Sequence, residues 1–205
     1  MVDQNAPDKQ QVVSPATPIG ADGPYASARR VVVREVEALL RHVEEDSCTG
    51  LVAAIRDAHR VFVAGAGRSK LSVEGFAMRL MHLGLTVHVV GDSTTPATAE
   101  GDLLLVCSGS GETPTSLVMV ENAARSGTRI AAVTAKADSS LAQRADLLVH
   151  LAEFSQDHEP GRSSQFVGTL FEQGALLFFD SLILAYEQLY GKDPQDMLAR
   201  HTNME

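Results

Sequence analysis

The densest group of potential ligand-binding residues lies at 108–113, which reads Ser-Gly-Ser-Gly-Glu-Thr. It directly follows five apolar residues at 103–107, a pattern typical of a strand buried on both faces of a parallel sheet. Thr113 and Pro114 are residue types that begin a helix. Backbone N–H groups and hydroxyls in such a turn can bind an anion, most commonly phosphate. A tight turn without a ligand is the alternative, although it would not need three hydroxyl groups.

A second glycine turn, Gly-Ala-Gly-Arg-Ser-Lys, lies at 65–70 between an apolar segment and a helical pattern. It fails the dinucleotide-binding pattern G-x-G-x-x-G, because Lys70 stands at the third glycine, and it lacks the ending of a P-loop. What remains is the hydroxyl of Ser69 between two cations, Arg68 and Lys70. These residues could bind an anion or simply form the solvent-exposed start of a helix.

Two further residues could exchange protons with a substrate. Glu172 lies in the first turns of a nearly all-apolar helical segment, 168–190, where a carboxylate needs a partner or water. It could act as a general base, or it could be an acidic residue that the helix dipole favours. His201 lies near the end of the sequence, where a histidine is most simply solvent-exposed. The histidines show no spacing typical of a metal site, so we expect no metal.

The elements that must position these residues alternate between strand and helix. We expect strands at 61–64, 86–90, 103–107, 129–133 and 147–150. Helical crossovers between such short strands predict a parallel, doubly wound α/β sheet. Ligands bind these sheets at the carboxyl ends of the strands, where both glycine turns and the polar loop 91–96 are expected.

Helical segments precede and follow this sheet. We expect one helix at 27–45 and a second that Ser47 caps, both before the first strand. A long polar loop at 152–167 leads into the apolar helix 168–190, and Asp193-Pro194 opens a last short helix.

The composition favours one globular domain. The chain has 205 residues, of which 44% are hydrophobic, and a formal net charge of −9, which disfavours nucleic-acid binding. No apolar run is expected to reach membrane-spanning length, and the first residues do not resemble a secretory signal. Cys48 and Cys107 are expected to be free thiols, as is typical of the cytoplasm, with Cys107 a small buried residue. Residues 1–25 are proline-rich and predict a disordered tail before a domain at 26–205.

Several of these segments resemble the sugar isomerase (SIS) domain family and, more closely, the 6-phospho-3-hexuloisomerases. The segments are Val63–Ser69, Met78–Gly84, Gly91–Pro96, Ser108–Thr113 and Gly168–Gln173. The chain also ends Arg-His-Thr-Asn-Met-Glu, which is similar to that family's Arg-His-Ala-Asn-Leu-Glu. The resemblance runs from about residue 30 to the end. Lys70 departs from it, because family members often have a small residue there.

The resemblance implies a flavodoxin-like α/β fold and a ketose phosphate isomerase that needs no cofactor. The implied reaction interconverts D-arabino-3-hexulose 6-phosphate and D-fructose 6-phosphate through a cis-enediol. Glu172 would move the proton between carbons, and His201, from the same or a neighbouring subunit, would move protons between oxygens. The residues that would hold the phosphate are Ser69, Ser108, Gly109, Ser110, Gly111 and Thr113. Those that would line the sugar are Gly67, Arg68, Asp92, Thr94 and Thr95.

Partners follow from the same reasoning. Apolar surface on the helices at 27–58 and 168–190 predicts a homo-oligomer, a dimer or a tetramer. The resemblance implies a phosphosugar substrate, and a 3-hexulose-6-phosphate synthase as functional partner in the ribulose monophosphate pathway of formaldehyde fixation. No membrane or nucleic-acid partner is expected. Two alternatives stay open. One is another SIS aldose–ketose isomerase, such as one for arabinose 5-phosphate. The other is a non-catalytic sugar-phosphate sensor, although 25 residues before the domain are too few for a DNA-binding module.

Overall fold

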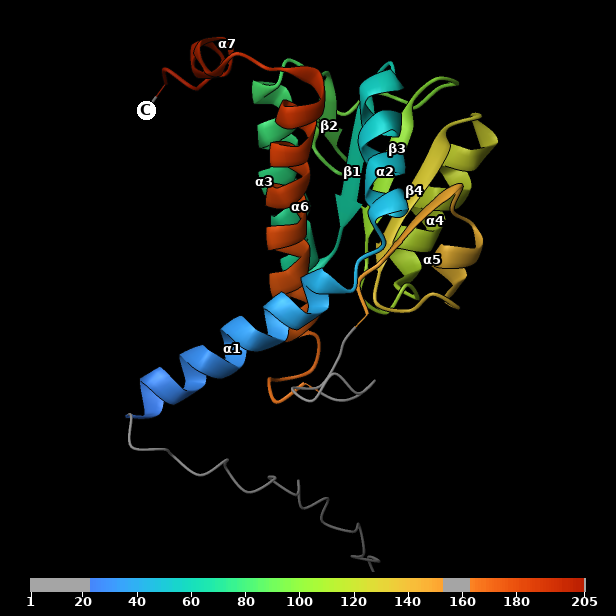
Figure 1. Cartoon of the computed structure of the whole chain (residues 1–205). Coiled ribbons are helices and arrows are strands. Elements are labelled where there is room, and N and C mark those ends of the chain that lie inside the picture. Colours follow the sequence, from blue (N-terminus) through green and yellow to red (C-terminus); the bar gives the residue numbers. More distant parts are fainter. Residues whose placement is uncertain (1–22, 153–162, 205) are drawn as a thin grey trace, which may run out of the picture.

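Five parallel strands form the centre of the computed structural model, which describes residues 23–152 and 163–204 (Figure 1). Their order in the sheet is β2-β1-β3-β4-β5, which confirms the predicted flavodoxin-like, doubly wound α/β fold. The strands are β1 (Val61–Gly65), β2 (Val87–Val89), β3 (Leu103–Cys107), β4 (Arg129–Thr134) and β5 (Leu147–His150). Apolar side chains alternate between the two faces, so both faces need a covering layer.

Helices supply those layers, and the described part of the chain contains seven. They are α1 (Pro24–Arg41), α2 (Glu45–Asp57), α3 (Gly67–His82), α4 (Pro114–Arg125), α5 (Ser140–Gln143), α6 (Thr169–Tyr190) and α7 (Pro194–Ala199). One face of the sheet, with Val63 and Leu105, packs against α2, α3 and α6. The other face, with Phe62 and Leu104, packs against α4 and α5.

The register of the central strands fixes where the two glycine turns emerge. Val61 pairs with Leu103 and Gly65 with Cys107, so β1 and β3 end at the same level. The turn after each strand therefore starts at the same edge of the sheet, side by side with the other. This edge is where parallel α/β sheets bind ligands.

Several predicted boundaries were wrong. The helix at 27–45 is α1, which ends at Arg41, and Ser47 does not cap α2, because that helix already begins at Glu45. Glu45 and Asp46 favour the earlier start, since acidic side chains stabilise the positive end of a helix. Likewise α3 begins at Gly67, so most of the glycine turn predicted at 65–70 is the first turn of that helix.

Two further expectations concern segments that the structure describes in part. Of the predicted tail at 1–25, the structure describes 23–25, and Pro24 already begins α1. The loop at 152–167 falls mostly on residues outside the described ones. The domain boundaries therefore stay predictions.

Helix α6 differs from the sequence expectation in two respects. By length and composition it could cross a membrane, although no run of that length was predicted, yet half of its most apolar window (50%) is buried in the fold. It packs along α3, beside α1 and α2, as a core helix does. It is not buried all round, however, because Leu176, Leu177 and Leu184 are 45–59% exposed.

A partly buried ion pair stabilises the opposite edge of the sheet. Asp102 accepts hydrogen bonds from Arg60 Nη2 at 2.6 Å and Nε at 3.0 Å, and from Ala99 N at 2.8 Å. Burial opposes ionisation of this carboxyl group, but the bonds from Arg60 and Ala99 outweigh it. They hold the pKa of Asp102 below its ordinary value of 3.8. The carboxylate thereby ties the loop before β3 to the start of β1.

We expect Asp102→Asn to lower the free energy of unfolding by about 1–3 kcal/mol, because it weakens a charged hydrogen-bond network. Asp57→Asn is the control, since the side chain of Asp57 is 62% exposed and its pair with Arg56 lies in solvent. Urea unfolding of both variants measures the difference. It should persist down to about pH 4 and disappear as the pH falls through the lowered pKa of Asp102. Equal effects of the two substitutions would contradict this role.

Candidate functional site

The first turns of α3 and α6 meet through an ion pair. Arg68 Nη1 lies 2.8 Å from Glu172 Oε2, and both helices begin at the carboxyl edge of the sheet. The Glu172 side chain is 25% exposed and that of Arg68 56%, so solvent reaches both groups. The carboxylate therefore has a cation as its partner and faces water, as a base that must reach a substrate requires.

The turn after β3 is organised by its own hydroxyl groups. Ser108 Oγ and Thr113 Oγ1 are 3.0 Å apart, and Ser108 Oγ also accepts a hydrogen bond from Gly111 N at 3.2 Å. Thr113 is the N-cap residue of α4 as predicted, but its hydroxyl bonds to Ser108 and makes no capping bond. Ser110 Oγ accepts from Glu112 N at 3.2 Å. The turn is thus preformed, with its amide groups at the start of α4.

Two glycines allow this turn to approach its neighbours. Gly111 has a φ of +63°, and a Cβ there would overlap the side chain of Ser139. A Cβ on Gly109 would lie 2.9 Å from Phe171 Cδ1. Since Phe171 immediately precedes Glu172, the β3–α4 turn lies directly against the first turn of α6. The structure therefore brings the predicted phosphate-binding turn and the predicted base together.

Ser69 joins the same region from α3. Its side chain is largely buried beside Cys107, the last residue of β3. Burial raises the pKa of Cys107, the Ser69 side chain opposes the rise in part, and the resulting pKa is about 12. Cys107 is therefore a buried, protonated thiol, as expected from the sequence. Gly67 and Arg68 precede Ser69 in this turn, and a Cβ on Gly67 would meet no atom within 4 Å.

Three of the predicted sugar-lining residues lie elsewhere in this chain. Asp92, Thr94 and Thr95 line a hollow of about 300 Å³ between the edge strand β2 and the middle of α3. Thr95 Oγ1 donates to Val89 O at 2.6 Å, which fixes this loop on β2. The structure does not bring these residues next to Glu172. The reason is that β2 pairs with β1 only as far as Val63, two residues before β1 ends, so the loop leaves β2 short of the carboxyl edge.

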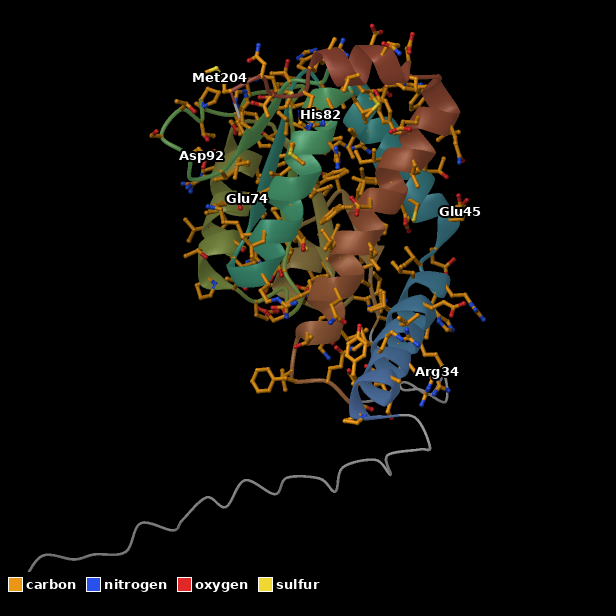
Figure 2. All side chains as sticks on the ribbon, turned by 90° about the vertical axis from the view of Figure 1, so that its left-hand side faces the viewer. Arg34, Glu45, Glu74, His82, Asp92 and Met204 are labelled. Atoms are coloured by element: carbon orange, nitrogen blue, oxygen red, sulfur yellow. The ribbon has the colours of Figure 1, made fainter. Side chains whose placement is uncertain are left out.

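His201 also lies away from Glu172 in its own chain. Its ring stacks on that of His82, with centroids 5.3 Å apart. Arg68 and His82 lie near opposite ends of α3, about 20 Å apart at a rise of about 1.5 Å per residue. Figure 2 shows His82 at the end of the molecule opposite Arg34 of α1. Glu172 and His201 of one chain therefore do not share a site in this structure.

Sequence analysis overlooked one residue of the turn itself. Glu112 Oε1 accepts a hydrogen bond from Ser140 N at 2.6 Å. Hydrogen bonding to Ser140, chiefly to its backbone N–H, lowers the pKa of Glu112. The bond connects the β3–α4 turn to the start of α5. A signal existed, because an acidic side chain often satisfies the N–H groups at a helix start, but α5 is distant in sequence.

Lys70, whose role the sequence left open, points along α3. Its Nζ lies 3.4 Å from Glu74 Oε1 in an exposed pair one turn apart.

Within residues 23–152 and 163–204, no group of three or more histidine, cysteine, aspartate or glutamate side chains is placed to hold a metal ion. The groups that the structure brings together beside the first turn of α6 are one carboxylate, one guanidinium, hydroxyls and amides.

Comparison with known proteins identifies the family of this chain. Residues 54–170 match the SIS domain. A 3-hexulose-6-phosphate isomerase of Mycobacterium gastri is 43% identical over 83% of this chain and 86% of its own. A 3-hexulose-6-phosphate isomerase of Bacillus subtilis is 37% identical over 85% of this chain and 95% of its own. A Methanococcus jannaschii protein, whose crystal structure infers a molecular function of 3-hexulose-6-phosphate isomerase, superposes with a TM-score of 0.76 at 30% identity, over 87% of this chain and 99% of that one. The chain therefore belongs to the SIS domain family and, within it, to the 3-hexulose-6-phosphate isomerases, also called 6-phospho-3-hexuloisomerases.

Proposed function

We propose that this chain is an isomerase that interconverts D-arabino-3-hexulose 6-phosphate and D-fructose 6-phosphate. The observation that carries the proposal is the Glu172–Arg68 pair beside the β3–α4 turn, in a chain similar to hexulose phosphate isomerases over most of its length. A carboxylate next to a phosphate-binding turn is the arrangement that proton transfer on a phosphosugar requires.

The reaction moves a carbonyl group between C3 and C2 of the sugar. Glu172 removes the proton from C2 and returns it to C3, through a cis-enediol. The turn with Ser108, Gly109, Ser110, Gly111 and Thr113 holds the phosphate, together with Ser69. Arg68 lies close enough to Glu172 to donate hydrogen bonds to the sugar oxygens as negative charge develops on them. No cofactor takes part in these steps.

His201 acts in this scheme from a neighbouring subunit. Within one chain His201 is close to His82, far from Glu172, so a second copy would have to supply it. The same holds for the hollow with Asp92 and Thr94, which lies outside the Glu172 region of its own chain. In the proposed oligomer, His201 of one copy moves protons between the sugar oxygens bound at Glu172 of another.

An apolar groove offers a surface for this assembly. The α1–α6 groove, of about 700 Å³, is defined by its lining residues Val32, Val33, Val36, Glu37, Leu40, Arg41, Gln173, Leu176 and Leu177. Most are apolar, and Leu176 and Leu177 are each 45% exposed in the single chain. Exposed apolar surface of this kind is typical of subunit interfaces. We propose a dimer or a tetramer on this basis.

The proposed cellular context rests on the similarity to hexulose phosphate isomerases. The substrate would be supplied by a 3-hexulose-6-phosphate synthase, which places the enzyme in the ribulose monophosphate pathway of formaldehyde fixation. Cys48 and Cys107 are both free, in keeping with a cytoplasmic location.

The proposal is tested by a coupled assay that follows fructose 6-phosphate. Hexulose 6-phosphate is made in situ from formaldehyde and ribulose 5-phosphate by a synthase. We expect turnover by the intact protein, also with EDTA present, and a loss of about 10²- to 10⁴-fold in Glu172→Gln, because the amide cannot accept the proton. Glu121→Gln, at a side chain that is 53% exposed on α4, should retain full activity.

The outcomes separate the candidate functions. No turnover by the intact protein would contradict the hexulose phosphate reaction, and arabinose 5-phosphate would be tested next. Binding of both sugars without turnover of either would favour a sensor. Full turnover by Glu172→Gln would keep the function and remove Glu172 as the base.

The oligomer is tested by light scattering at micromolar concentration. We expect the mass of a dimer or tetramer, and a shift towards the monomer in Leu177→Glu, because the charge would be buried in the α1–α6 groove. Asp180→Asn, a neighbouring exposed position on α6, is the control. A monomeric intact protein would contradict both the assembly and the proposed role of His201.

A shared site is tested by mixing two inactive variants. We expect Glu172→Gln and His201→Ala each to be nearly inactive, and a dimer reassembled from equal amounts to regain about a quarter of the original activity. Half of the mixed dimers' sites would combine an intact Glu172 with an intact His201. Unfolding and refolding each variant by itself is the control. No recovery in a mixture shown to exchange subunits would contradict a site built from two chains.

A further inference from the structure

Helix α1 carries a carboxylate that no part of the proposed mechanism uses. Glu35 is fully buried, with an exposed fraction of 0%. It accepts three hydrogen bonds from one short segment: Ser163 Oγ at 2.7 Å, Ser164 N at 2.9 Å and Gln165 Nε2 at 3.0 Å. A buried carboxylate is costly unless its oxygens are satisfied in this way. Here the partner is the segment 163–165, which precedes α6, the helix that carries Glu172.

The ionisation of Glu35 agrees with this geometry. Burial opposes the charged form, but the hydrogen bonds from Ser163, Gln165 and Ser164 outweigh it and lower the pKa of Glu35. The residue is therefore a carboxylate at neutral pH. Both of its oxygens are engaged, and hydrogen bonds to a charged acceptor are stronger than neutral ones.

The segment that Glu35 holds runs directly into α6. Thr169 N donates to Phe166 O at 3.0 Å, and Glu172 N donates to Gly168 O at 3.1 Å. Gly168 is the N-cap residue, with a φ of +83°, and no side chain caps the helix there. Phe166 is 83% exposed, so apolar burial does little to fix the segment. The hydrogen bonds to Glu35 are thus a main restraint on how the chain enters the turn that carries Glu172.

A second contact of α1 lies on the other side of Glu172. Leu39, one turn after Glu35, packs against Gly174, where a Cβ would come within 2.7 Å of Leu39 Cδ2. Helix α1 thereby contacts the chain at 163–165, before Glu172, and at Gly174, after it. These two contacts bracket the first turn of α6, beside which α1 lies in Figure 1, and so restrain Glu172 relative to α3 and the β3–α4 turn.

We propose that Glu35 is a positioning residue for the isomerase reaction, which sets the geometry of Glu172 through the segment 163–168. The inference rests on the proposed function, since Glu172 is the base of that reaction. Glu35 itself does not touch the substrate. Because small displacements of a catalytic group lower the rate strongly, the loss of this restraint should affect the chemical step more than substrate binding.

The test is the substitution Glu35→Gln, measured as kcat and KM separately on protein whose folded fraction is known from circular dichroism. One amide oxygen can replace one carboxylate oxygen but not both. We expect kcat to fall by about 10- to 100-fold while KM changes by less than about twofold. Glu121→Gln, an exposed change of the same type, should leave both constants unaltered.

A second variant approaches the restraint from the other side. Ser163→Ala removes the donor of the 2.7 Å bond without a change in α1. We expect a smaller decrease in kcat, and a double variant whose decrease is less than the product of the two single ones, because both act through one contact. Hydrogen exchange should become faster in the amides of 163–172 in both variants, with the amides of β3 and β4 unchanged.

The outcomes distinguish this inference from the proposed function. If the folded Glu35→Gln protein keeps its kcat, or if KM rises as much as kcat falls, the positioning role is wrong while the isomerase function stands. If the intact protein has no isomerase activity, the function fails, and the exchange experiment still decides whether Glu35 restrains the start of α6. Multiplicative effects of the two variants would contradict a shared route.

Discussion

The level at which β1 and β3 end is the constraint on which the site depends. Gly65 pairs with Cys107, so two turns of unlike sequence leave the sheet side by side. Helix α3 then begins with Arg68 and Ser69, while Ser108 and Gly109 lead into α4. Because both turns contain glycine or small residues, α6 can bring its first turn against Gly109 through Phe171. The pair between Arg68 and Glu172, 104 residues apart in sequence, is a consequence of this register.

Different elements restrain the predicted phosphate-binding turn and the predicted base. The β3–α4 turn is fixed by short bonds of its own, between Ser108, Gly111 and Thr113, and by Glu112 to α5. The turn therefore keeps its shape through bonds of its own. Glu172 is held instead by neighbours that come from other elements, Arg68 on α3 and the segment restrained by Glu35 on α1. A rigid anchor for the phosphate and an independently positioned base are what a proton transfer between adjacent carbons requires.

Local patterns predicted the sheet because each strand is apolar enough to be read without its neighbours. The run at 103–107 and the glycine turn that follows it identified β3. Local patterns also singled out Ser69 and Glu172, and the resemblance to SIS domains supplied their expected roles and that of His201. What failed depends on contacts distant in sequence. The position of the Asp92 loop follows from the short pairing of β2 with β1, and the bonds of Glu35 join α1 to residues about 130 positions later. The burial of Glu35 could not be predicted from the sequence, because Arg34 and Glu37 beside it are charged residues typical of an exposed helix face.

Helix α1 takes part both in the proposed subunit contact and in the positioning of Glu172, a link that the sequence did not indicate. Val33 and Val36 line the α1–α6 groove. Glu35 and Leu39 contact the chain on either side of Glu172. If a second copy occupies the groove, it covers the helix that fixes the base. In the proposed oligomer, a second copy would also supply the His201 that each chain keeps beside its own His82. Subunit contact would then contribute to catalysis in two ways, by supplying a proton-transfer group and by stabilising the restraint on Glu172. An isolated chain would possess Glu172 and the β3–α4 turn without either contribution.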